Sequence, residues 1–118
     1  MSVFSRLFRP KNEKSRRFRE EMAKHLDRRA VKYVTERLPG ENTDSVIGRA
    51  GELLCRDGDI LVVAGDGVLF RGKIADPDTK MSELMSLEGV IIEGKDLSRG
   101  GQFRTVIAYY TYYRKVNP

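Results

Sequence analysis

Few side chains in this sequence belong to the types that perform catalysis or bind metals. The chain of 118 residues contains one histidine and one cysteine, so no His/Cys cluster at metal-ligand spacing can form. Cys55 follows two leucines, and a free cysteine in such an apolar context is usually a small buried hydrophobe. His25 has no nucleophile near it in the sequence. We therefore predict that the protein is not an enzyme and has no catalytic residues.

Acidic and glycine-rich motifs offer the next candidates for chemistry. Asp57-Gly-Asp59 and Asp76-Pro-Asp78 could supply oxygen ligands to Ca²⁺ or Mg²⁺, but neither continues as an EF-hand loop. Asp beside Gly or Pro is ordinary turn chemistry. Gly65-Asp-Gly67 lacks the spacing of a phosphate-binding loop. We therefore predict no bound metal and no cofactor.

Positive charge is concentrated in the first third of the chain. Residues 1–38 contain twelve Lys/Arg and five Asp/Glu, whereas residues 39–118 contain ten and twelve. A basic helix face could follow the phosphates of RNA or DNA. The alternative is a solvated face, because Glu20 and other acids offset part of the charge at i,i+4 spacing. The candidate residues for nucleic-acid or anion binding are Arg17, Lys24, Arg28 and Lys32.

Four of the five tyrosines lie in one stretch near the end of the chain, Phe103–Lys115. Its β-branched and aromatic residues predict a strand with two apolar faces. Alternation places Phe103, Ile107, Tyr109 and Tyr113 on one face and Val106, Ala108, Tyr110 and Tyr112 on the other. The tyrosine rings could be core, could form a protein interface, or could stack on bases. The candidate interface residues are Phe18, Tyr110 and Tyr112.

Hydrophobic spacing predicts the elements that must position these residues. Asn12–Leu38 shows the 3.6-residue period of a helix, and Pro39-Gly40 ends it. Strands separated by turns follow, among them Ser45–Arg49 and Glu52–Arg56 around a hairpin-like break at Ala50-Gly51, and then Asp59–Ala64. Lys80–Leu87 is typical of one or two helical turns. The last two strands, Val90–Glu93 and the tyrosine-rich stretch, are expected to pair as a hairpin. The predicted fold class is α+β: a long N-terminal helix packed on a curled antiparallel sheet or partly open barrel of five or six strands, with one short inserted helix.

The chain is long enough for one domain. We predict an N-terminal tail at residues 1–10 and a single domain at residues 11–118, with helix 12–38 and a β-rich body at 45–115. No apolar run approaches the length of a spanning helix, and a lone thiol suits the cytoplasm. Residues 3–8 could form a weak basic amphipathic anchor for a peripheral membrane protein.

The function predicted from the sequence is a non-enzymatic binding or interaction module that engages a protein partner or a second copy of itself. Self-association follows from two size mismatches: a helix of about 40 Å on a body of about 30 Å, and a terminal strand longer than its neighbours. The alternatives are an RNA- or DNA-binding protein and, less favoured, a peripheral membrane protein.

Overall fold

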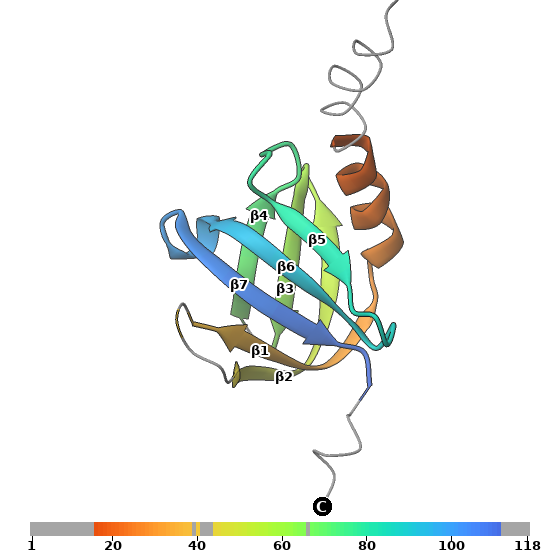
Figure 1. Cartoon of the computed structure of the whole chain (residues 1–118), viewed down its shortest axis with the longest axis vertical. Coiled ribbons are helices and arrows are strands. Elements are labelled where there is room, and N and C mark those ends of the chain that lie inside the picture. The colour runs from red at the N-terminus through yellow and green to blue at the C-terminus, as the bar shows by residue number, and fades with distance from the viewer. Residues whose placement is uncertain (1–15, 39, 41–43, 66, 112–118) are drawn as a thin grey trace, which may run out of the picture.

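The computed structural model describes residues 16–38, 40, 44–65 and 67–111, which form one helix and one antiparallel sheet. The helix spans residues 16–26. Seven strands follow in the sheet order β4-β3-β2-β1-β7-β6-β5 (Figure 1). This arrangement confirms the α+β prediction, but with seven strands in place of five or six. The strands are β1 (Ala30–Arg37), β2 (Asp44–Arg56), β3 (Asp59–Ala64), β4 (Gly67–Lys73), β5 (Lys80–Glu83), β6 (Gly89–Asp96) and β7 (Gln102–Tyr109).

The helix predicted over Asn12–Leu38 is wrong in its second half. Arg28 has a φ of 67°, which ends the helical path, and its N–H donates to the carbonyl of Leu53 at 2.7 Å. The chain then becomes strand β1, which pairs with β2 on one side and β7 on the other. β-branched side chains in this stretch suit a sheet, so pairing with two strands overrides helical spacing. Residues 12–15 lie outside the described residues.

The inserted helix predicted at Lys80–Leu87 is also wrong. Residues Lys80–Glu83 form β5 and pair with β6, from Lys80 opposite Glu93 to Glu83 opposite Val90. Four ladder pairs with β6 outweigh the helical spacing of the apolar residues here. A single 3₁₀ turn, η1 (Leu97–Arg99), follows β6 instead.

Strand β2 is one continuous strand of 13 residues, where two strands were expected on either side of Ala50-Gly51. Ala50 has a φ of 55°, so the strand bends there without ending. β2 pairs with β1 from Asp44 to Glu52 and with β3 from Gly51 to Arg56, so the two ladders overlap just after the bend. Gly51 has a partner on each side, Val31 and Ala64. The bend therefore lies where the main pairing partner of β2 changes from β1 to β3.

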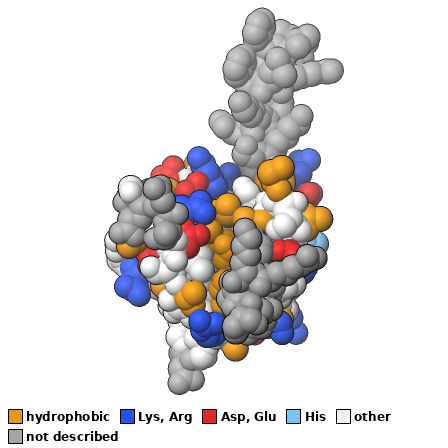
Figure 2. Space-filling view, turned by 60° about the horizontal axis from the view of Figure 1, so that its bottom comes forward, with side chains coloured by type: hydrophobic (Ala, Val, Ile, Leu, Met, Phe, Trp, Pro, Cys, Tyr) orange, Lys and Arg blue, Asp and Glu red, His pale blue; other side chains and the backbone are white. Residues whose placement is uncertain are grey.

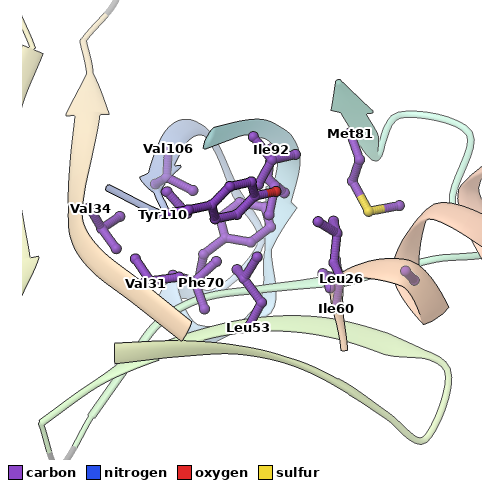
Figure 3. Packing of buried hydrophobic residues seen from close by; sticks show 14 of the residues in the cluster. Leu26, Val31, Val34, Leu53, Ile60, Phe70, Met81, Ile92, Val106 and Tyr110 are labelled. Carbon is purple, nitrogen blue, oxygen red and sulfur yellow. The ribbon is translucent and has the colours of Figure 1, made fainter. Parts of the chain in front are cut away.

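The main core lies on the inner face of the curved sheet, and the helix covers its open end (Figures 1 and 3). Leu26 of the helix and Met81 of β5 reach the same cluster as Phe70 and Tyr110. The predicted alternation along the last strand is confirmed for its described part. Val106, Ala108 and Tyr110 join this main cluster, while Ile107 and Tyr109 form a second cluster with Tyr33.

The two size mismatches that motivated self-association are absent from the described residues. A helix of 11 residues is about 16 Å long at 1.5 Å per residue. Strand β7 contains 8 residues, the same number as β1 and β6, which flank it. The chain bends at Tyr110 and Thr111, directly after β7. Neither element extends beyond the sheet as described.

Candidate functional site

A buried ionic cluster joins the edge strand β4 to β6, β7 and β1. We call Glu36, Asp96 and Arg104 the Arg104 cluster. The Arg104 guanidinium donates from Nε and Nη2 to the Glu36 carboxylate at 3.0 and 2.8 Å. Its Nη1 donates to Asp96 Oδ2 at 2.6 Å and to the carbonyl of Leu69, in β4, at 2.8 Å. The cluster therefore provides β4 with hydrogen-bond partners that no neighbouring strand supplies.

Asp96 completes this connection from β6. Its side chain is fully buried, and Oδ1 accepts from the backbone N–H of Arg71, in β4, at 3.0 Å. The same oxygen accepts from the backbone N–H and the hydroxyl of Ser98 at 2.9 and 2.6 Å. Burial by itself would raise the pKa of Asp96, but hydrogen bonds from Ser98, Arg104 and Arg71 outweigh it and lower the pKa.

The Arg104 cluster positions strands and is not built to bind a ligand. Four of the five N–H donors of Arg104 are engaged by Glu36, Asp96 and Leu69. Hydrogen bonding to Arg104 also lowers the pKa of Glu36, which keeps this carboxylate charged. A guanidinium so fully occupied has little capacity left for a phosphate or carboxylate from outside.

Stability should fall as the pH falls below about 4, where an unperturbed aspartate takes up a proton. The lowered pKa of Asp96 contributes stability that is present above its unfolded-state pKa and lost as pH falls through the folded-state pKa. Asp96→Asn should therefore unfold more readily at pH 7 and show a shallower loss between pH 5 and pH 2. Urea denaturation across that range measures both effects. Asp57→Asn, at an exposed turn, is the control. If the free energy of unfolding of Asp96→Asn fell with pH as steeply as that of wild type, the prediction would be wrong.

Two side chains, one in the helix and one in the turn after it, fasten this part of the chain to the rest of the domain. Arg19, buried on the inner side of the helix, donates from Nε to the carbonyl of Ile74 at 2.8 Å. Asp27 accepts from the backbone N–H of Cys55 at 2.8 Å, and this bond is the largest cause of its lowered pKa. Both contacts lie next to the core residues Ala23 and Leu26. The helix is thus a fixed part of the domain.

A groove of about 500 Å³ lies between the helix and the segments that carry Cys55, Gly58 and Ile74. Its charged lining has both signs, with Arg17 and Lys24 beside Glu20 and Glu21. Burial and then the nearby Asp27 carboxylate raise the pKa of Cys55, which also lines the groove, so the thiol stays protonated at neutral pH. His25 is not part of the lining and lies 3.5 Å from Glu83 instead.

The four predicted nucleic-acid-binding residues are all exposed, but they lie on different elements. Arg17 and Lys24 are in the helix, Arg28 is in the turn that follows it, and Lys32 is in β1. The described residues contain sixteen Lys/Arg and fourteen Asp/Glu, so the charge is close to balanced. On the face of the molecule that Figure 2 shows, the basic side chains are spread among acidic and hydrophobic ones. No single basic surface emerges from the described part of the chain.

The three predicted interface residues have different surroundings. Phe18 is 52% exposed on the helix, as an interface residue should be. Tyr110, also a candidate interface residue, is instead buried in the core, where burial raises its pKa to about 12. The guanidinium of Arg29 lies 3.9 Å from the centre of its ring, a cation–π contact. Tyr112 lies outside the described residues.

The structure reveals an apolar surface that sequence reasoning missed, at the turn between β5 and β6. We call Met85, Ser86 and Leu87 the apolar tip. Met85 is fully exposed, at 102%, and Leu87 is 67% exposed. Leu87 also has a φ of 62°, a left-handed conformation that glycine or asparagine adopts with less strain. The sequence shows both apolar residues, but the prediction of helical turns grouped Met85 with Met81 and Leu84 and did not single out an exposed turn.

The base of the apolar tip is held in place. The Leu84 N–H donates to the carbonyl of Gly89 at 2.9 Å, and the Leu87 N–H donates to the carbonyl of Leu84 at 2.8 Å. The Tyr110 N–H donates to the carbonyl of Glu88 at 2.8 Å. Leu84 also packs against the second cluster. Two large apolar side chains are thus presented to solvent from an anchored turn.

Comparisons with protein-family models, curated proteins and solved structures produce no match. Within the described residues, His, Cys, Asp and Glu form no group of three or more that could hold a metal ion. The described part of the chain also contains no helix with the length and hydrophobicity needed to cross a membrane.

Proposed function

We propose that this domain is a non-enzymatic protein-binding module that inserts its apolar tip into a pocket of a partner protein. The exposure of Met85 and Leu87 carries the proposal, because turn residues are ordinarily polar or small. The left-handed conformation of Leu87 supports the proposal as well, since residues held in sparsely populated backbone regions cluster at functional sites.

The charge next to the tip favours a protein over a membrane or a nucleic acid. The turn begins and ends with Glu83 and Glu88, and residues 83–89 contain no Lys or Arg. Negative charge opposes approach to anionic lipid and to phosphate backbones. An apolar pocket with basic residues at its rim is the complementary partner surface. Self-association remains a prediction, without the size arguments that first motivated it.

Replacing both apolar side chains of the tip should weaken partner binding at least about 10-fold, because central apolar anchors dominate interface energies. The variant is Met85→Ser combined with Leu87→Asn, since asparagine tolerates the left-handed conformation. The free energy of unfolding should stay level or rise by about 1 kcal/mol, as strain at Leu87 is relieved. Native capture of partners by the full chain, followed by affinity measurement with the purified partner, makes this test.

The matched control is Leu97→Ser, which removes a side chain that is 44% exposed and lies in η1, away from the tip. It should leave binding unchanged. The capture is repeated with nuclease and with detergent. Recovery that resists both treatments and depends on the tip supports the proposal. Equal recovery of the partner by wild type, the double variant and Leu97→Ser would contradict the proposal. Loss of recovery on nuclease treatment would also contradict it, and would favour nucleic-acid binding through Arg17, Lys24, Arg28 and Lys32.

A further inference from the structure

The two methionines of the β5–β6 hairpin lie in opposite surroundings. Met81, in β5, is 3% exposed and packs in the core against the helix (Figure 3). Met85, four residues later, is fully exposed at 102%. Met22, in the helix, is intermediate and packs against the same core as Met81. Among the methionines that the structure describes, Met85 is therefore the one most exposed to solvent, and it lies within a surface that we propose binds a partner.

We infer that Met85 is a selective oxidation site through which peroxides control binding by the apolar tip, a regulation that rests on the proposed function. A peroxide transfers one oxygen atom to the thioether sulfur. The sulfur lone pair forms the S–O bond, the O–O bond breaks, and water is released when the oxidant is hydrogen peroxide. The product, a sulfoxide, is polar where the partner pocket requires an apolar group.

Exposure makes this oxidation compatible with an intact fold. Met85 belongs to neither hydrophobic cluster, so its sulfoxide displaces no core contact. Oxidation of Met81 would instead place a polar group among Leu26, Phe70 and Ile92. The change at Met85 is also reversible, because methionine sulfoxide reductases restore the thioether with electrons from thiols. The site thus has the properties of a switch: accessible, reversible and without effect on folding.

The first test treats the purified full chain with hydrogen peroxide and follows each methionine by peptide mass mapping. We expect Met85 to oxidise at least about 10-fold faster than Met81, since oxidation follows exposure. The thermal midpoint should stay unchanged while Met85 alone is oxidised, and a reductase with dithiol should reverse the mass shift. Equal rates at Met85 and Met81, or a lowered midpoint with Met85 alone oxidised, would overturn the inference.

The second test measures binding to the purified partner before and after peroxide. Wild type should lose affinity when Met85 is oxidised, whereas Met85→Leu, compared with its own affinity before treatment, should not change when peroxide is added. If oxidised wild type binds as well as untreated protein while Met85→Ser with Leu87→Asn does not bind, this inference fails and the proposed function stands. If that double variant binds like wild type, or no tip-dependent partner is captured, the proposed function fails and the regulation fails with it. The peptide map then still decides whether Met85 is the selective site.

Discussion

Replacing Arg104 with methionine should lower the free energy of unfolding by about 3–5 kcal/mol at pH 7, the usual cost of removing one partner from a buried ion pair. The Arg104 side chain is 4% exposed and that of Asp96 is fully buried, so methionine would leave a carboxylate in the interior without its cation. The carbonyl of Leu69 would lose its donor as well. Urea denaturation followed by circular dichroism measures the loss.

Three further variants separate lost charge pairing from lost packing. Arg37→Met breaks an exposed pair with Asp44, joined at 3.1 Å, and should cost about 1 kcal/mol or less. Arg104→Lys keeps one charge without the planar fork and should fall between wild type and Arg104→Met. Adding Asp96→Asn to Arg104→Met should recover part of the loss. A cost for Arg104→Met no larger than that for Arg37→Met would contradict the assigned role.

Adding one methyl group at Gly51 should destabilise the domain by about 3 kcal/mol, the upper range for overpacking a well-packed interior. A Cβ at Gly51 would lie 2.0 Å from the carbonyl oxygen of Val63 and 3.0 Å from the Cα of Ala64. Both obstacles belong to the paired strand β3, so a side-chain rotation cannot relieve them. The backbone would have to separate where β2 passes between β1 and β3. Thermal and urea unfolding of Gly51→Ala check this.

Two other glycines provide matched controls for the same substitution. A Cβ at Gly67 meets nothing within 4 Å, so Gly67→Ala should change stability by less than about 1 kcal/mol. A Cβ at Gly48 would lie 2.5 Å from a methyl group of Leu69, which can rotate away, so Gly48→Ala should cost an intermediate amount. The expected order of loss is therefore Gly51, then Gly48, then Gly67. Equal effects at Gly51 and Gly67 would contradict it.

Alternating and turn-bounded patterns predicted the sheet well. The expected strand Asp59–Ala64 is β3 with the same bounds, and its antiparallel pairing with β4 follows from the turn between them. The hairpin of the last two strands is β6 with β7. The alternation of side chains along β7 was also predicted correctly. These features depend on contacts between neighbours in the sequence, where side-chain period and turn chemistry suffice.

The errors arose where distant strands decide the local conformation. Ala30–Arg37 has apolar residues at helical spacing, yet β2 and β7 supply hydrogen bonds on both sides and make it a strand. Lys80–Glu83 is a strand because β6 pairs with it. Four apolar residues in a stretch of eight fit the period of a helix and that of a strand. At this length the pattern is therefore ambiguous, and the available pairing partner decides the conformation.

The sequence by itself determined the composition of the candidate sites: one histidine, one cysteine, a basic first third and a tyrosine-rich end. Only the tertiary structure decided which of these residues are available to a partner. It placed Arg104 and Asp96 together in the interior, Tyr110 in the core, and Met85 and Leu87 at an exposed turn. The physical reason is that burial and ion pairing depend on which strands become neighbours. Residues 69, 96 and 104 meet only because the sheet curves until β4 lies against β6.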